Sequence, residues 1–306
     1  MSRRGNGRRI NGIFLLDKDK GITSNDALQR VKRLFGAEKA GHTGSLDPLA
    51  TGVLPICFGQ ATKFSQFLLD SDKSYETTIK LGVVTDSGDA DGVILSQHPV
   101  PALNKAEINK KLSTFRGKIK QIPPMFSAIK IDGKPLYKLA RKGITIERPE
   151  RQVEIFKLEL LSICDNEIKL FIQCSKGTYI RSLAEDIGTA LGCGGHVKEL
   201  KRLSVGPFSI GKSFSYSSLT LIENDFKRLD SKLLSISSVV SDWPKILVAE
   251  HSGKSLRNGR TILIDEVLSL GMVRIFSREL KGVSDFLGVG EVFADGRVVP
   301  RKILVK

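Results

Sequence analysis

Residues 41–52 read Gly41-His-Thr-Gly-Ser-Leu-Asp-Pro-Leu-Ala-Thr-Gly52 and predict a rigid loop between two regular elements. Glycines and a proline punctuate the stretch, and glycine allows the backbone to approach a ligand closely. Pro48 biases the backbone of Asp47 toward an extended conformation. A lone carboxylate on such a loop, with His42 and Thr43 nearby, suits a nucleophile or a general base. An aspartate that only forms a turn is the alternative interpretation.

Short strands and helices are predicted on both sides of this loop. Apolar residues with helical spacing follow Ser24, a candidate N-cap, and stop at Gly36. Asp165-Asn166 joins two alternating runs and indicates a hairpin. The expected strands are 13–17, 53–58, 75–81, 153–163 and 167–174, and the other expected helices are 61–69, 179–191 and 217–234.

The sequence pattern changes after Trp243-Pro244. Residues 246–306 form short β-rich runs separated by turn residues, a pattern typical of a small β-barrel. We therefore expect an α/β (α+β) chain with a domain boundary near residue 245.

Composition and charge narrow the classes of function. The chain has 306 residues, of which 41% are hydrophobic and 26% charged, an ordinary globular mix. No apolar run approaches the ~20 residues of a membrane span, and the basic N-terminus lacks the apolar region of a secretory signal. The net charge of +15 and pI near 9.7 favour a polyanionic partner, nucleic acid in particular. A merely soluble basic surface is the alternative.

Cysteines and histidines are few and scattered. The four cysteines show no two-residue spacing, and the four histidines do not cluster with them. We expect no metal site, and free thiols suit a reducing cytoplasm.

Positive charge is concentrated in residues 116–151, which hold ten basic and three acidic residues. Prolines interrupt the segment, and Phe126 and Tyr137 lie among its lysines. This composition indicates a protruding element that contacts RNA, with an ordinary solvated insertion as the alternative.

The string Gly206-Pro-Phe-Ser-Ile-Gly-Lys-Ser213 matches the P-loop pattern but lacks its context. A P-loop needs free backbone N–H groups between a strand and a helix. Pro207 removes one donor, and residues 214–218, which directly follow the string, do not start an amphipathic helix. We therefore reject nucleotide hydrolysis.

The 41–52 loop resembles the catalytic motif of the bacterial tRNA pseudouridine-55 synthase family, and further blocks follow in family order over at least residues 11–207. These blocks are Asn11–Lys18, Ser24–Asp26, Lys73–Glu76, Thr85–Gly92, Gln121–Lys130, Cys174–Arg181, Gly194–Val197 and Leu200–Leu203. The C-terminal part resembles, less specifically, the family's small RNA-binding (PUA-like) β-barrel.

The resemblance implies a pseudouridine synthase fold with a mixed, largely antiparallel central sheet and a C-terminal barrel. Residues 1–245 would form the catalytic domain, with an RNA-clamping insertion at about 116–151, and residues 246–306 the RNA-binding domain. The implied activity is isomerisation of uridine 55 in the TΨC loop of tRNA. The enzyme would be a cytoplasmic monomer that needs no cofactor or metal.

The resemblance also assigns site residues. Asp47 matches the essential aspartate, Arg181 the arginine that pairs with it, and Tyr75 the tyrosine that stacks on the flipped uracil. Asp47 could attack the ribose or base, or take the C2′ proton to give a glycal. The matched substrate-binding residues are His42, Tyr179, Leu200 and Lys63. His42 would fill the gap left by the flipped nucleotide, and Lys63 would contact the RNA backbone.

A second hypothesis from another class is a non-catalytic RNA chaperone with the same basic surface. Release of tritium from C5-labelled uridine in tRNA distinguishes the two.

Overall fold

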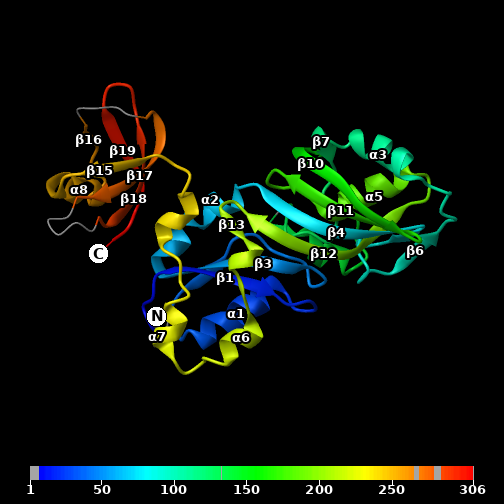
Figure 1. The fold of residues 1–306 in the computed structure, drawn as a ribbon, viewed down its shortest axis with the longest axis horizontal. Helices are drawn as coiled ribbons and strands as arrows, with labels where there is room; N and C mark the ends of the chain where they lie inside the picture. Colours follow the sequence, from blue (N-terminus) through cyan, green and yellow to red (C-terminus); the bar gives the residue numbers. More distant parts are fainter. Residues whose placement is uncertain (1–6, 132, 265–268, 279–283, 306) are drawn as a thin grey trace.

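Two β-sheets form the frame of the protein, for which we analysed a computed structural model (Figure 1). The structure describes residues 7–131, 133–264, 269–278 and 284–305. The larger sheet has ten strands in the order β14-β1-β3-β12-β4-β11-β10-β7, with β13 on β12 and β2 on β3. Its strands are β1 (Gly12–Lys18), β2 (Ala40–His42), β3 (Thr51–Phe58), β4 (Lys73–Leu81), β7 (Gly117–Gln121), β10 (Arg151–Cys164), β11 (Glu167–Cys174), β12 (Gly195–Val205), β13 (Phe208–Ser209) and β14 (Phe214–Ser215).

Most neighbours in this sheet are antiparallel, and only β1 with β14 and β3 with β12 are parallel. The prediction of a mixed, largely antiparallel sheet is therefore confirmed. β1 and β3 are buried along nearly their whole length, as expected of apolar runs in the middle of a sheet. The hairpin of β10 and β11 turns at Asp165, whose φ of 50° is the left-handed conformation that aspartate tolerates.

Helix α1 (Ser24–Leu34) begins one residue earlier than predicted. Its N-cap is Thr23, whose hydroxyl accepts a hydrogen bond from Asp26 N at 3.1 Å. Ser24 instead lies inside the helix, and its hydroxyl binds both backbone groups of Leu46, at 2.7 and 2.9 Å. Ser24 therefore anchors the 41–52 loop rather than capping the helix.

Two predicted helices are broken into shorter pieces. Residues 61–69 form a 3-10 helix, η1 (Gly59–Phe64), followed by α2 (Ser65–Leu69). The helix predicted over 217–234 is wrong: α6 (Tyr216–Thr220) and α7 (Phe226–Asp230) are separate. Ser215 and Asp225 each cap a new helix by accepting a backbone N–H, because such side chains compete with helix continuation.

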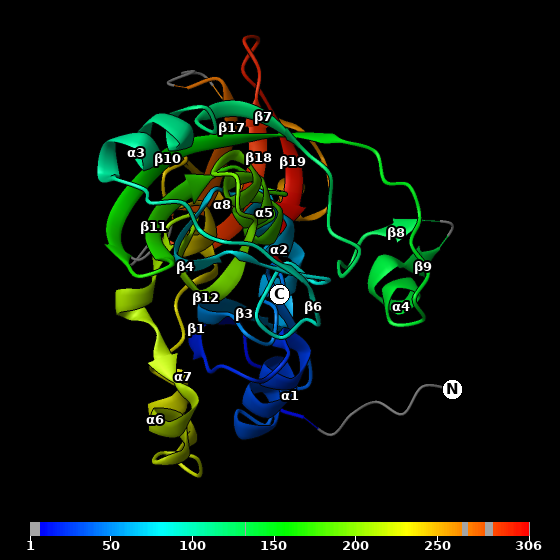
Figure 2. The same ribbon diagram turned by 90° about the vertical axis from the view of Figure 1, so that its right-hand side faces the viewer.

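The basic insertion projects from the sheet beyond β7 (Figure 2). It holds β8 (Lys130–Ile131), β9 (Lys134–Pro135) and α4 (Leu136–Ala140). Leu136 is fully buried, and its N–H donates to Ile129 O, which ties the start of α4 to the chain before β8. The small sheet of β5 (Val83–Thr85) and β6 (Ile94–Gln97) precedes α3 (Lys105–Ser113), and α5 (Ile180–Ala190) packs on β12.

The C-terminal sheet has the order β15-β17-β18-β19-β16 (Figure 1). Its strands are β15 (Lys245–Val248), β16 (Ile262–Leu263), β17 (Gly271–Ser277), β18 (Phe286–Val292) and β19 (Arg297–Ile303). Helix α8 (Glu250–Arg257) was not predicted, because a mostly polar helix that buries only Gly253 and Leu256 shows little apolar periodicity.

Aromatic side chains join the C-terminal sheet to the rest of the molecule. Phe64 of η1 lies 5.8 Å, ring centre to ring centre, from Phe286 of β18. Phe67 of α2 lies 5.0 Å from Trp243, next to η3 (Ile236–Val240). These rings belong to one hydrophobic cluster with Val289 of β18, so the two sheets share a core.

The P-loop-like string forms β13 and the short 3-10 helix η2 (Ile210–Lys212), and β13 pairs with β12. This is not a loop followed by a helix, which agrees with the rejection of that motif. No helix in the described part of the chain is both long and apolar enough to cross a membrane.

Candidate active site

The loop that carries Asp47 runs from the end of β2 to the start of β3 and is anchored on both sides of the carboxylate. Leu46 is bound by Ser24, as described above. Pro48 O accepts from Gly21 N at 2.8 Å and from Lys18 Nζ at 3.4 Å. Asp47 O accepts from Ala50 N at 3.0 Å. These hydrogen bonds fix the backbone on which the carboxylate is carried.

Arg181 lies in the first turn of α5 and meets this carboxylate. Its Nε is 2.9 Å from Asp47 Oδ2. The Arg181 side chain is 6% exposed, whereas that of Asp47 is 38% exposed. The guanidinium is therefore a buried support, and the carboxylate remains accessible from outside.

Other groups hold the Arg181 guanidinium in place. It donates to Ser87 O at 3.0 Å and to Phe126 O, in the basic insertion, at 2.8 Å. Asp89 Oδ2 lies 3.7 Å from Nη1, and the Asp89 side chain is 7% exposed. The Ser87 hydroxyl donates to Asp89 Oδ1 at 2.7 Å. One arginine thus faces two carboxylates, with a close ion pair to Asp47 and a longer one to Asp89.

Opposing influences act on Asp47. Burial raises the pKa of its carboxyl above the ordinary value, and Arg181 opposes that shift. Asp89 adds to the rise, and Lys18 opposes it. Burial also lowers the pKa of Lys18 to about 8, although three backbone carbonyls accept from its Nζ. Arg181 is therefore the main group that favours the ionised form of Asp47.

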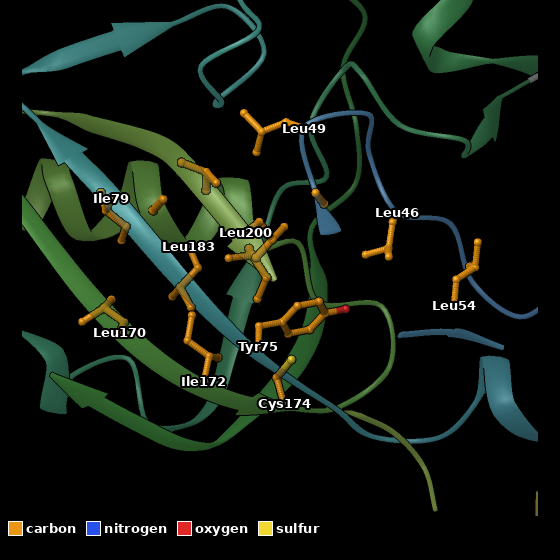
Figure 3. Close-up of a cluster of buried hydrophobic side chains, with 14 of the residues drawn as sticks. Leu46, Leu49, Leu54, Tyr75, Ile79, Leu170, Ile172, Cys174, Leu183 and Leu200 are labelled. Atoms are coloured by element: carbon orange, nitrogen blue, oxygen red, sulfur yellow. The ribbon is translucent and has the colours of Figure 1, made fainter. Parts of the chain in front are cut away.

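Tyr75 of β4 and Leu200 of β12 lie on neighbouring strands and are each 8% exposed. Figure 3 shows the Tyr75 ring among Leu183, Ile172, Cys174 and Leu200, with its hydroxyl directed toward the segment that carries Leu46. Burial raises the pKa of the phenol to about 12. The ring forms an apolar wall with one polar end.

His42 and Tyr179 lie at the ends of two elements. His42 ends β2, and its Nδ1 is buried without a hydrogen-bond partner among the described residues. Burial and the nearby Arg202 lower the pKa of this imidazole. Tyr179 precedes α5, and its backbone N–H donates to Gln121 Oε1 at 3.1 Å. Burial raises the pKa of its phenol.

Lys63 is not in contact with the site residues described above, but with the C-terminal sheet. It belongs to η1, and its Nζ donates to Gln60 Oε1 at 3.4 Å and to Ile303 O of β19 at 3.3 Å. These contacts tie it to the C-terminal sheet, so its contact with RNA stays a prediction.

Sequence reasoning assigned no role to Lys18, Asp89 or Arg202. All three are polar side chains buried to 5% exposure or less. Each lies in a block that resembles the family, which was the only available signal, because the sequence does not show that a polar residue is buried.

Comparison with known proteins covers nearly the whole chain. The TruB family pseudouridylate synthase N-terminal domain matches residues 32–180, the tRNA pseudouridylate synthase B C-terminal domain residues 181–241, and the pseudouridine synthase II TruB C-terminal domain residues 244–304. "tRNA pseudouridine synthase B" of Ectopseudomonas mendocina (strain ymp) is 50% identical over 97% of this chain and 96% of its own length. The protein of the same name from Nitrosococcus oceani is 48% identical over 99% and 97%.

Solved structures share the fold. A chain from the structure of an H/ACA RNP bound to a substrate RNA containing 2′-deoxyuridine has a TM-score of 0.73, with 22% identity over 96% of this chain and 85% of that one. A chain of a Cbf5–Nop10–Gar1 complex has a TM-score of 0.72, with 23% identity over 96% and 84%. At this identity the likeness concerns the fold alone.

Proposed function

Because this chain belongs to the TruB family of pseudouridylate synthases, we propose that Asp47 carries the reaction by which it isomerises a uridine of tRNA to pseudouridine. The observation behind this assignment is the 2.9 Å ion pair between Arg181 and Asp47, in which only the carboxylate is accessible. A carboxylate whose ionised form is stabilised by an adjacent guanidinium is suited to attack or to accept a proton.

The reaction rearranges one nucleotide without net gain or loss of atoms. The N1–C1′ bond breaks, the uracil turns, and a C5–C1′ bond forms. The proton on C5 leaves, and N1 gains one from solvent. Asp47 acts either as the nucleophile at the ribose or base, or as the base at C2′. Both routes require the ionised carboxylate that Arg181 stabilises.

Access to Asp47 requires that the uridine leave its stack. Extrusion costs a few kcal/mol of unstacking, which protein groups must offset. Tyr75 receives the uracil on its ring face, and Leu200 and Tyr179 line the pocket around the nucleotide. His42 enters the gap left in the RNA, a role consistent with its unpartnered Nδ1.

The substrate is the T-arm of tRNA, at uridine 55. The insertion at about 116–151 clamps the RNA, supported by its ten basic residues and by the hydrogen bond from Arg181 to Phe126 O that links it to the site. Residues 1–245 act as the catalytic domain, and residues 246–306 bind RNA. Contacts with phosphates supply most of the affinity, and the shape of the loop selects the substrate.

The enzyme works as a monomer in the cytoplasm. Its cysteines are all free, which suits a reducing compartment. Light scattering of the purified protein at micromolar concentration tests the monomer, and a dimer mass would contradict it.

A single-turnover assay tests the function. The purified chain is mixed in excess with a T-arm hairpin whose uridine 55 carries tritium at C5. We expect release of the label and a pseudouridine in the product. A hairpin from another arm of the same tRNA, labelled at a loop uridine, is the control and keeps its label. Binding without release would favour the RNA chaperone.

A further inference from the structure

Arg202 is the largest fully buried side chain in the described part of the molecule, and the proposed reaction gives it no role. It lies on β12 directly opposite Tyr75 of β4. Residues opposite each other on neighbouring strands point to the same face of a sheet. Arg202 and Tyr75 therefore share the face on which the site is built.

The Arg202 guanidinium joins three elements of the site. Its Nε donates to Val53 O of β3 at 2.9 Å, and its Nη2 donates to Gly44 O at 3.2 Å. Gly44 precedes Asp47 by three residues on the same loop. The phenol of Tyr75, which lies opposite Arg202 in the strand register, interacts with the same guanidinium. The planar fork thus places the phenol and the catalytic loop against one rigid group.

Within the described residues, Arg202 forms no ion pair with a carboxylate. Among the described residues, no aspartate or glutamate oxygen lies within 4.0 Å of its guanidinium. Its charge instead disfavours the protonated forms of Lys18, His42 and Lys73 nearby. A buried cation without a counter-ion is costly, so the polar groups that face it must offset that cost. Tyr75 is the acidic group that its field acts on most directly.

The groups around Tyr75 act in opposite directions on its phenol. Burial, Cys174 of β11 and Asp47 raise the pKa of the phenol, and Arg202 opposes all three. Without Arg202 the phenol would therefore hold its proton still more tightly.

We propose that Arg202 is a positioning residue that holds the Tyr75 oxygen at the reacting base and stabilises its phenolate. This inference rests on the proposed function, in which the C5 proton must be removed after the C5–C1′ bond has formed. For that step Tyr75 first gives its own proton to solvent and becomes the phenolate. The C5–H bond then breaks, its electron pair returns to the uracil ring, and the proton forms the O–H bond on Tyr75. Exchange with solvent then releases this proton.

The first experiment needs no RNA. Ring-fluorinated tyrosine, whose phenol is intrinsically more acidic, replaces the four tyrosines, and Tyr75→Phe assigns the Tyr75 signal in ¹⁹F spectra. We expect Arg202→Gln to raise the pKa of that phenol by about 1–3, the range for loss of an adjacent opposite charge. Arg151→Gln, which removes an exposed arginine near Tyr179, is the matched control and leaves the Tyr75 signal unchanged. An unchanged pKa in Arg202→Gln overturns the proposal.

The second experiment measures single-turnover tritium release from bound tRNA. We expect Arg202→Gln to slow release about 10- to 100-fold with a tRNA Kd within about threefold, because the lost function concerns proton transfer. Arg202→Lys restores part of the rate. In the Tyr75→Phe background the same Arg202→Gln change slows release by no more than about threefold. A full additive loss there would show that Arg202 does not act through Tyr75.

A thermal melt shows whether Arg202→Gln is folded. If it is not, the contact between Arg202 and Tyr75 can still be tested without changing Arg202. The N–H groups of the buried Arg202 guanidinium should exchange slowly and give ¹H–¹⁵N signals in wild type. Tyr75→Phe must shift these signals if the phenol contacts the guanidinium, and unmoved signals refute the contact. If wild type itself releases no tritium, the proposed function fails, whereas the ¹⁹F result still decides the contact between Arg202 and Tyr75.

Discussion

The Arg181 guanidinium lies 2.9 Å from the Asp47 carboxylate, although Arg181 follows Asp47 by 134 residues (181 minus 47) in the chain. The pairing depends on the sheet, because the Asp47 loop precedes β3 while Arg181 begins the helix that packs on β12. β3 and β12 are adjacent and parallel over a short stretch. The two charged groups are thus brought together by the central strands of the fold.

Replacing Asp47 by Asn should abolish turnover while leaving tRNA binding within a few-fold of wild type. The amide can neither attack nor accept a proton, whereas phosphate contacts dominate affinity. Tritium release and filter binding measure the two quantities. Asp165→Asn makes the same chemical change at the turn of the β10–β11 hairpin and should keep full activity. Activity in Asp47→Asn would remove Asp47 from the mechanism.

Arg181→Met should lower the free energy of unfolding by about 3 kcal/mol at pH 8, because the buried Asp89 and the partly exposed Asp47 lose their counter-ion. Arg181 opposes the rise that burial causes in the pKa of Asp47, and it faces Asp89, which is 7% exposed. The loss should shrink toward pH 4, where protonated carboxyl groups need no partner. Adding Asp89→Asn to Arg181→Met should recover part of the stability at pH 8. Urea unfolding measures the stability of wild type, of Arg181→Met and of the double variant. A loss of stability that does not depend on pH would contradict the ion-pair explanation.

Replacing Lys130, Lys134 and Lys138 by Ala should weaken tRNA binding and reduce the slope of log Kd against log salt by about 2, since each phosphate contact contributes about 0.7–0.9. All three residues are exposed on the insertion. The matched control removes Lys105, Lys110 and Lys111 from α3 and should leave the slope nearly unchanged. Equal slopes in the two triple variants would show that the insertion does not clamp the RNA.

The sequence predicted the elements whose pattern is local. The loop at 41–52, the strands on either side of it and the β10–β11 hairpin follow from glycine, proline and alternating apolar residues. The helix predicted over 217–234 was wrong, because Asp225 caps a second helix where the apolar spacing alone suggested continuation. Local hydrogen bonds of short polar side chains decided that outcome.

The site was predictable only in part. Asp47 stood out by its rigid loop, but the pairing with Arg181 came from the family resemblance, since spacing carries no signal over so long a separation. Asp89 sits in a turn rich in acidic residues, which the sequence alone suggests is solvent-exposed, yet it is buried beside Arg181. Burial of a polar side chain depends on long-range packing and leaves no local pattern.

Glu185→Gln should stabilise the protein at pH 8 by about 1–2 kcal/mol. Burial, reinforced by Asp186, raises the pKa of Glu185 from 4.5 to about 7. A carboxyl group with a raised pKa contributes stability below pH 4.5 that is lost as the pH rises through 7. The amide in Glu185→Gln cannot ionise, so the variant does not lose stability as the pH rises. Calorimetry at pH 5 and 8 measures the difference.

Glu167→Gln is the control for Glu185→Gln, because it should change the stability at pH 8 in the opposite direction. Lys198 and Lys80 lower the pKa of Glu167, so its stabilising effect is present at neutral pH and is lost as the pH falls. Glu167→Gln should therefore destabilise the protein slightly at pH 8. If both variants changed stability in the same direction there, the assignment for Glu185 would be wrong.

Gly52→Ala should slow turnover about 100-fold, because displacing a reacting group by about 1 Å can cost that much. Gly52 has a φ of 104°, and a Cβ there would lie 2.2 Å from Arg202 O. The strand must shift to relieve this contact, and it carries both Val53 O and the end of the Asp47 loop. Gly177 has a similar positive φ of 79°, but a Cβ there would meet nothing within 4 Å. Gly177→Ala should therefore cost only backbone strain and should leave the turnover rate unchanged. Tritium release and thermal melts compare the two, and equal rates would mean that the close approach of β3 to β12 does not position Asp47.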